Sequence, residues 1–261
     1  METVKQIPYG VADFESVINQ NMYYVDKTMY LAELEKQPRT LIFIRPRRFG
    51  KSLFISMMRA YYDKSKADRF DKLFGSLWIG SHPTPLRNHY QVLYLDFSRI
   101  LGNIDVLEEK FNSYCCDQLN DFIDTYRDDY PKERVEEFLR SDDHGQKLNL
   151  LLNMSRKYGQ ALYLIIDEYD SFTNIVFSEQ VEETYFKTSL IGRFYSHVFK
   201  LFKGMFERIF LIGVSPVTLD DLTSGFNIGW NVSMAPELDK MLGFSTEDVR
   251  QMFTYYKETG Q

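Results

Sequence analysis

Four short apolar runs restrict the fold of this chain more than any other feature of its 261 residues. They cover 41–44, 92–95, 162–166 and 209–212, and their length and aliphatic, partly β-branched composition are typical of strands buried on both faces. Long stretches with helical spacing separate them. Strands that alternate with helices pair in parallel and carry helices on both faces of the sheet. The sequence therefore predicts an α/β fold, with a parallel sheet sandwiched between helices.

Apolar side chains at helical spacing predict helices at 29–34, from 53 onward, and at 105–126, 147–157, 182–203 and 246–259. Asp26 or Thr28 could cap the first of these helices, and Pro38 should end it. The segment 75–89 is predicted as a loop because it is rich in helix-breaking residues. The segment 216–236 has little periodicity, so we expect a loop that is either functional or a plain surface connection.

Composition and charge limit the classes of protein to be considered. An apolar content of 44% supports a substantial core, in one large α/β domain or two small ones. The net charge of −6 gives no general attraction to nucleic acid or to an anionic membrane, although a local basic groove is compatible with it. The two cysteines, Cys115 and Cys116, are adjacent on a predicted helix and point in different directions, which favours a reducing compartment. The polar N-terminus and the lack of an apolar run near the ~20 residues that span a bilayer predict a cytoplasmic protein.

A phosphate-binding motif follows the first apolar run. Gly50, Lys51 and Ser52 stand between that run and a helical pattern that begins at Leu53. A P-loop needs a small residue where backbone N–H groups close on phosphate oxygens, then a Lys for the terminal phosphates and a hydroxyl for Mg²⁺. The three residues match these roles in the required order of strand, loop and helix. The alternative is a basic surface loop between a core strand and a core helix.

The loop departs from the usual P-loop pattern at its first position. Arg45 stands where a Gly is usual, and Pro46, Arg47, Arg48 and Phe49 follow it. A β-carbon at that position restricts the turn. In compensation, the three arginines would bring guanidinium groups to the phosphate oxygens. We expect at least one of them to face solvent or to pair with an acidic neighbour instead.

Acidic and hydroxyl residues follow the later strands. Asp167 ends the third run and is suited to hold the hydration shell of Mg²⁺, and Glu168 is placed to polarise an attacking water as general base. The alternative for this pair is helix capping or solvation at a strand end. Asp170 is interpreted as a cap or a structural hydrogen-bond acceptor. Ser215 follows the fourth run as a candidate γ-phosphate sensor, or simply as the start of a turn with the Pro that follows. Since ligands gather at the carboxyl ends of parallel strands, these residues should meet there, with Asp96 as a weaker candidate.

With these motifs the chain resembles the AAA-ATPase-like family of bacterial P-loop proteins over almost its whole length. An Arg-rich loop without its first Gly is itself a trait of that family. The likeness rests on Ile7-Pro8-Tyr9-Gly10 with Asp13-Phe14, Tyr24–Thr28, Arg45–Leu53, Leu95–Ser98, Ile165–Asp170 and Gly213–Asn227.

The resemblance implies an ASCE/AAA-like P-loop NTPase core that binds and hydrolyses ATP with Mg²⁺. Lys51, Glu168 and Ser215 would be catalytic, and Ser52 and Asp167 would hold the metal. Nucleotide contacts are expected from Arg45, Pro46, Arg47, Arg48, Phe49, Gly50, Lys51, Ser52 and Leu53. We expect an N-terminal segment (1–38) near the nucleotide, an ATPase core (39–245) and the start of a C-terminal helical region (246–261).

Family members often carry a PD-(D/E)XK nuclease-like domain after the ATPase, so the resemblance also suggests nucleic acid as a partner through such a domain. Glu108-Glu109-Lys110 matches half of the nuclease pattern, but it is interpreted as a solvated helical face because no strand with an Asp precedes it. The apolar residues of 246–259 need cover, which suggests a chain cut short or a naturally shortened member.

Two functions from different classes remain open on the sequence. In the first, the protein is a Mg²⁺-dependent ATPase that drives a conformational change for an attached effector or a partner. In the second, it is a nucleotide-gated interaction switch with little hydrolysis. Glu168 favours the first, since a pure binder needs no base beside the metal ligand. A fold that has lost nucleotide binding is a third reading. No choice of Arg finger is made among Arg193, Arg208 and Arg250, so the oligomeric state stays open.

Overall fold

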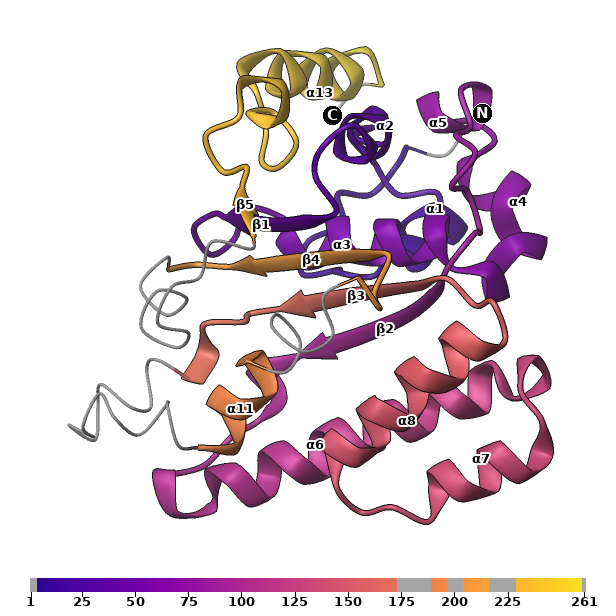
Figure 1. Cartoon of the computed structure of the whole chain (residues 1–261). Coiled ribbons are helices and arrows are strands. Elements are labelled where there is room, and N and C mark those ends of the chain that lie inside the picture. The colour runs from indigo at the N-terminus through magenta and orange to yellow at the C-terminus, as the bar shows by residue number, and fades with distance from the viewer. Residues whose placement is uncertain (1–3, 173–188, 197–203, 216–228, 260–261) are drawn as a thin grey trace. The chain divides into compact units, whose positions relative to one another are not determined.

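The computed structural model describes residues 4–172, 189–196, 204–215 and 229–259. The chain forms two compact units, and each of them is assembled from segments that are separate in the sequence. The first unit comprises 1–37, 47–88 and 232–261, and the second comprises 38–46 and 89–231. Figure 1 shows the helices and strands of both units.

The second unit contains a five-stranded parallel sheet in the order β2-β3-β4-β1-β5 (Figure 1). Its strands are β1 (Thr40–Ile44), β2 (Gln91–Asp96), β3 (Leu162–Asp167), β4 (Arg208–Gly213) and β5 (Trp230–Asn231). Every residue of β3 is buried, as expected for a parallel strand without polar alternation. The α/β class, the parallel pairing and the four predicted strands are confirmed. The short β5 is an addition, because it lies in a segment that we predicted as a loop.

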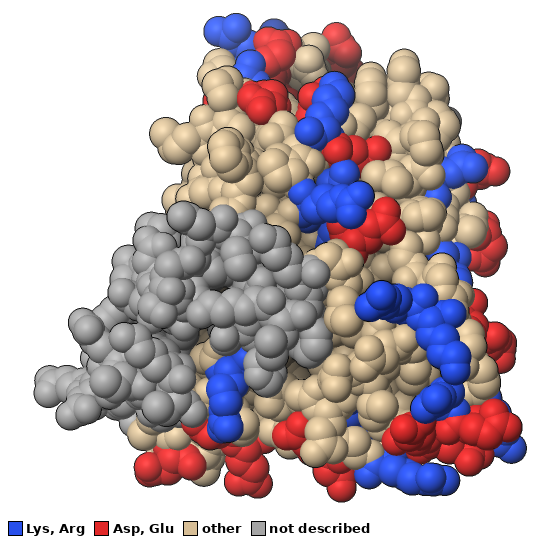
Figure 2. Space-filling model, in the orientation of Figure 1, with Lys and Arg blue, Asp and Glu red and all other residues tan. Residues whose placement is uncertain are grey.

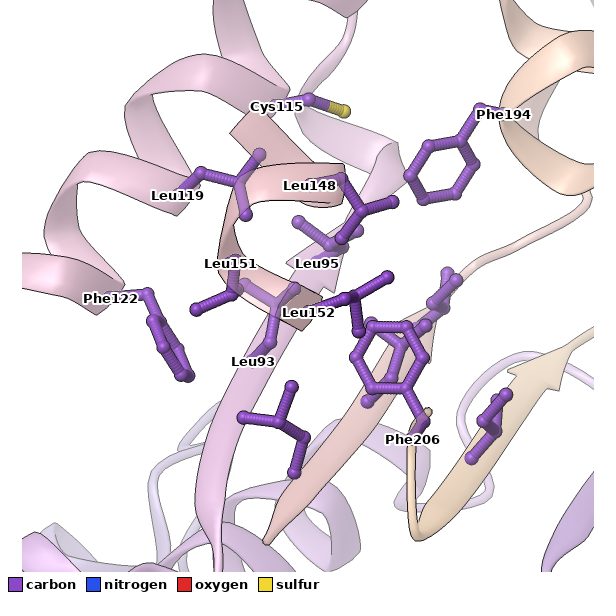
Figure 3. Packing of buried hydrophobic residues seen from close by; sticks show 14 of the residues in the cluster. Leu93, Leu95, Cys115, Leu119, Phe122, Leu148, Leu151, Leu152, Phe194 and Phe206 are labelled. Atoms are coloured by element: carbon purple, nitrogen blue, oxygen red, sulfur yellow. The ribbon is translucent and has the colours of Figure 1, made fainter. Parts of the chain in front are cut away.

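Helices of the second unit form the main core with this sheet. They are α6 (Ile104–Thr125), α7 (Lys132–Leu139), α8 (His144–Lys157) and α11 (Leu190–Ser196). Leu93 and Leu95 of β2 face Leu119 of α6 and Leu151 of α8, and Figure 3 shows these side chains interdigitating. Deleting such a side chain, as in Leu151→Ala, costs about 2–5 kcal/mol because a cavity is left behind. Cys115 and Cys116 are both buried free thiols, and burial raises the pKa of each.

One predicted helix of the second unit is confirmed over the part that the structure describes. We expected a helix at 182–203, and α11 spans residues 190–196 of that range; positions 173–188 and 197–203 lie outside the described residues. The start of α11 is tied to α6, because the Leu190 N–H donates to Glu108 Oε1 at 3.1 Å. Glu108 thus has a structural partner. This contact agrees with the interpretation of Glu108-Glu109-Lys110 as part of a helical face and not as half of a nuclease motif.

The first unit is built from helices. It contains α1 (Phe14–Asn19), α2 (Met29–Glu35), α3 (Lys51–Tyr62), α4 (Phe70–Phe74), α5 (Trp78–Ser81) and α13 (Thr246–Glu258), with 3₁₀ turns at Lys64–Arg69 and Pro236–Leu238. The N-terminal segment packs against α3, where the Phe14 N–H donates to Ser56 Oγ at 2.9 Å. The Phe14 ring is buried between Tyr24 and Phe74, at centroid distances of 5.4 and 5.1 Å. These contacts connect the N-terminal segment to the helix that begins at Lys51.

Asp26 and Thr28 cap a different helix from the predicted one. Neither side chain bonds to the first turn of α2, although the helix starts where we expected. Instead, Asp26 Oδ2 accepts from the Trp78 N–H at 2.7 Å, and Thr28 Oγ1 accepts from the Ile79 N–H at 3.1 Å. The two residues therefore satisfy the first N–H groups of α5, a tertiary contact that the local sequence does not show.

The C-terminal helix α13 is anchored on the N-terminal segment of the same unit. Its start has a capping box between Ser245 and Asp248. Asp248 also pairs with Lys27 at 2.7 Å, and the Tyr256 hydroxyl donates to the Lys5 carbonyl at 2.7 Å. The predicted apolar face is thus covered in part, while Phe253 stays 67% exposed. Within the described ranges, the structure contains no helix that combines the length and the apolar character required to cross a bilayer.

Candidate functional site

The carboxyl ends of four neighbouring strands lie level in the second unit. Asp167 at the end of β3 is opposite Asp96 of β2 on one side and Ile212 of β4 on the other. Ile44, the last residue of β1, is opposite Gly213 of β4. The polar residues that follow these strands therefore leave the sheet at one edge, which is where α/β proteins bind ligands.

Asp167 and Glu168 form the acidic corner of this edge. Asp167 is only 2% exposed, although the rest of β3 is apolar. The Glu168 N–H donates to Asp167 Oδ1 at 2.9 Å, and Glu168 itself is half-buried with a left-handed φ of +49°. A buried carboxylate needs compensating partners, and carboxylate oxygens are ligands that Mg²⁺ prefers. The roles of Asp167 as metal ligand and of Glu168 as base stay predictions.

The next two residues connect the acidic corner to the end of β4. The buried Tyr169 donates from its hydroxyl to the Ser215 carbonyl at 2.6 Å. Asp170 Oδ2 accepts from the Val214 N–H at 3.1 Å and from the Ser215 N–H at 2.6 Å. The predicted role of Asp170 as a structural hydrogen-bond acceptor is confirmed by these bonds. Ser215 follows directly from the strand next to Asp167, as its candidate role as a sensor requires.

Gly213 makes this close connection sterically feasible. A β-carbon on Gly213 would lie 2.4 Å from Asp170 Oδ1 and 2.7 Å from Tyr169 Cε1, so no other residue fits without a shift of these two side chains. Neither Gly213 nor Tyr169 was expected to have this function. The available signal was the Gly-Val-Ser string immediately after an apolar run, since a Gly at a strand end often marks a close approach of other groups.

The Arg-rich loop begins at the same edge of the sheet. The Arg45 N–H donates to the Gly213 carbonyl at 3.1 Å, which extends the pairing of β1 and β4 by one residue. The Arg45 guanidinium lies 4.5 Å from the Phe43 ring centroid and donates to the Ile44 carbonyl at 3.1 Å. The residues from Arg47 onward belong to the first unit, and the chain reaches them directly from the end of β1.

The backbone of the loop in the first unit alternates in a way that suits an anion. Arg48 and Gly50 have left-handed φ angles of +69° and +82°, whereas Arg47 and Phe49 do not. Alternation of this kind is typical of backbone turns that bind anions, and helix α3 begins directly after it at Lys51. The loop therefore combines an anion-binding type of backbone with a helix start, without the usual first Gly.

The side chains of the loop differ in exposure. Lys51 is buried at 5% exposure, while Ser52 is exposed at the first turn of α3. Arg47 and Arg48 are exposed, so the prediction that at least one arginine faces solvent is confirmed. Phe49 is held by the C-terminal segment, because its carbonyl accepts from the Gly243 N–H at 3.0 Å.

The remaining candidates have local structural partners. Asp96 Oδ1 accepts from the Ser98 hydroxyl at 2.6 Å, and Asp96 Oδ2 accepts from Arg99 Nε at 3.2 Å, so this carboxylate caps a short 3₁₀ turn. Among the residues that the structure describes, no group of three or more His, Cys, Asp or Glu side chains is arranged to hold a metal ion.

Comparisons with known proteins agree with this geometry. The family model described as "Predicted AAA-ATPase" matches residues 8–223. A curated relative from Azotobacter chroococcum mcd 1, named "Uncharacterized protein in vnfD 5'region", is 25% identical over 255 residues. The match covers 95% of this chain but 45% of the relative, so the chain spans less than half the length of that protein. No solved structure matches the chain.

Proposed function

Since this chain belongs to the predicted AAA-ATPase family, we propose that it binds ATP with Mg²⁺ and hydrolyses the terminal phosphate. The observation that carries the proposal is the gathering of Asp167, Glu168 and Ser215 at the sheet edge from which the Arg-rich loop departs. Phosphoryl transfer depends mainly on positioning and on electrostatic stabilisation, and these residues supply both kinds of group.

Each residue has a distinct task in this proposal. Lys51 attracts the terminal phosphates, and the N–H groups of the loop around Gly50 cradle their oxygens. Ser52 and Asp167 would hold Mg²⁺, which supplies charge neutralisation when it is bound. Glu168 accepts the proton of the attacking water, and Ser215 hydrogen-bonds the γ-phosphate or the water. Arg47 and Arg48 are exposed cations that strengthen the attraction of a polyphosphate.

Nucleotide binding is tested first by Lys51→Ala. The variant should lose the stabilisation that MgATP gives the wild type, because a ligand that binds only the folded chain raises its unfolding temperature. The measurement is thermal unfolding with and without MgATP, and Lys110→Ala, on an exposed position of α6, serves as the matched control. An equal shift in the wild type and Lys51→Ala contradicts the assigned site, and no shift in the wild type supports a fold that has lost nucleotide binding.

The second candidate function, a nucleotide-gated switch with little hydrolysis, is separated from an ATPase by Glu168→Gln. This variant keeps the shape of the side chain and removes the base, so it should retain bound ATP and lose phosphate release. Phosphate release by the wild type and the variant is the measurement. Equal and negligible release from both, with ATP bound, would favour the switch. The half-buried Glu168 beside Asp167 favours hydrolysis.

The partner, the location and the domain limits belong to the same proposal. On the face in Figure 2, basic and acidic side chains are interspersed, as suits a chain with a net charge of −6. We propose nucleic acid as a partner that binds through an attached C-terminal domain, and phosphate release with and without DNA or RNA, in this chain and in longer versions, tests that proposal. A cytoplasmic location is supported by the buried free cysteines. We keep 39–245 as the ATPase core, with 1–38 near the nucleotide and 246–261 opening a helical region.

A further inference from the structure

The backbone of Ser215 is held at both of its polar groups by two consecutive residues. The Tyr169 hydroxyl donates to the Ser215 carbonyl at 2.6 Å, and Asp170 Oδ2 accepts from the Ser215 N–H at 2.6 Å. Asp170 also accepts from the Val214 N–H, at 3.2 Å through Oδ1 and 3.1 Å through Oδ2. Tyr169 and Asp170 immediately follow Asp167-Glu168 in the sequence. We call this arrangement of Tyr169, Asp170 and the Ser215 backbone the Ser215 clamp.

The clamp is built to be rigid. The Tyr169 side chain is fully buried and Asp170 is only 5% exposed, so little water competes for the hydrogen bonds of the clamp. Bonds to a carboxylate are stronger than neutral ones. The space that Gly213 leaves empty lets both side chains approach the end of β4.

These hydrogen bonds connect Ser215 rigidly to the segment that contains Asp167 and Glu168. Tyr169 directly follows Glu168 and Asp170 is the next residue, so a displacement of Ser215 would break hydrogen bonds to the residues that adjoin Glu168. We propose that Tyr169 and Asp170 are positioning residues that fix Ser215 relative to Asp167 and Glu168, so that the sensor and the base act on the same phosphate. This inference rests on the proposed ATPase function and deepens it.

The test measures kcat and KM for ATP hydrolysis in variants of the two positioning residues. Tyr169→Phe removes the hydroxyl and keeps the ring, and Asp170→Asn keeps the size and weakens the bonds to the backbone. We expect kcat for ATP hydrolysis to fall about 10-fold to 100-fold in each, because small misplacements of reacting groups have effects of that size. KM for ATP should stay within about 2-fold, since nucleotide affinity is assigned to the loop and not to the clamp.

The matched control is Tyr126→Phe. The Tyr126 hydroxyl accepts from the Val92 N–H at 2.9 Å, so it too binds the backbone of a strand from a buried position, but close to the start of β2. This variant should lose a comparable amount of stability and keep its kcat. If Tyr169→Phe lowers kcat no more than Tyr126→Phe does, the clamp is merely structural and the proposal is overturned.

A double-variant cycle shows whether the clamp acts through Ser215. In a Ser215→Ala background, adding Tyr169→Phe should change kcat by less than 2-fold, because the group being positioned is already gone. Multiplicative effects of the two substitutions would overturn the proposal while leaving the ATPase function intact. A wild-type chain that shows no phosphate release would overturn both, and that measurement comes first.

Discussion

At the scale of single residues, Glu168 combines an unusual backbone with a central position in the site. Its φ of +49° is left-handed, and such a conformation costs a non-glycine residue roughly 1 kcal/mol. Two hydrogen bonds surround the turn, because the Glu168 N–H donates to Asp167 and its carbonyl accepts from the Ser171 N–H at 2.9 Å. Strain of this kind persists where function needs it, and it coincides here with the residue that we propose as the base.

This strain leads to a prediction on stability. Glu168→Gly should have a free energy of unfolding about 1 kcal/mol higher than that of Glu168→Ala, because glycine adopts a positive φ without a β-carbon clash. Both variants lose the carboxylate, so the difference between their free energies of unfolding reports the backbone strain at this position. Urea denaturation measures the difference. At Asp121, an exposed position inside α6, the order should reverse, with Ala more stable by about 1 kcal/mol. The same order at both positions would contradict the argument.

The sequence was sufficient for some residues of the site and not for others. Asp167, Glu168, Asp170 and Ser215 could be selected because each follows an apolar run, and parallel strands present such residues at one edge. The task of Tyr169 could not be predicted. Its hydroxyl reaches a carbonyl that lies 46 residues further along the chain, and no local pattern records such a contact.

At the scale of elements, long periodic segments were predictable and short ones were not. The helices at 105–126 and 147–157 were placed within a few residues of α6 and α8, because several buried side chains share one face. We did not predict the short elements α1, α4, α5, α7 and β5, and the prediction of 75–89 as a loop was wrong at α5. Each of these helices buries at most three residues, and both residues of β5 are exposed. Strand β5 exists through pairing with β1, which is a tertiary property.

The contact between Phe49 and Gly243 predicts that the turn before α13 supports the Arg-rich loop, which we propose to bind phosphate. A β-carbon on Gly243 would lie 3.1 Å from Phe49 Cδ1, and the φ of +78° is unfavourable for alanine. Gly243→Ala should therefore weaken MgATP binding several-fold by displacing Phe49 and the loop. The measurement is the Kd for MgATP in a Glu168→Gln background, in which hydrolysis is blocked.

The control for this prediction is Gly159→Ala in the second unit. Gly159 has a similar φ of +66°, but nothing lies within 4 Å of an added β-carbon. This variant should lose about 1 kcal/mol of stability from backbone strain and keep its Kd for ATP. An equal change of Kd in both variants would mean that general destabilisation, and not the contact with Phe49, weakens binding.

At the scale of the whole molecule, the chain crosses between its two units inside the nucleotide motif. The sheet and the acidic corner belong to the second unit, whereas Lys51 and Ser52 belong to the first. The first unit also contains carboxyl groups with lowered pKa values, a property that acidification can reveal.

Three carboxyl groups with lowered pKa lie in the first unit. Burial alone would raise the pKa of Glu15, but hydrogen bonds and charge attraction from Lys66 and Arg69 outweigh burial and lower it below 4.5. The pKa values of Asp13 and Asp248 are lowered below 3.8 in the same way, by hydrogen bonds that outweigh burial. A carboxyl group with a lowered pKa stabilises the fold above its ordinary pKa, and this contribution is lost as the pH falls toward the lowered value.

The first unit should therefore lose stability as the pH falls below about 5. The two tryptophans allow this to be followed, because Trp78 lies in the first unit and Trp230 in the second. In a Trp230→Phe background, the urea midpoint of Trp78 fluorescence should be lower at pH 3.5 than at pH 6. Adding Lys66→Gln should reduce that difference, because Glu15 then loses the partner that lowers its pKa. If Lys66→Gln leaves the difference unchanged, the pairing with Glu15 does not stabilise the unit through this linkage.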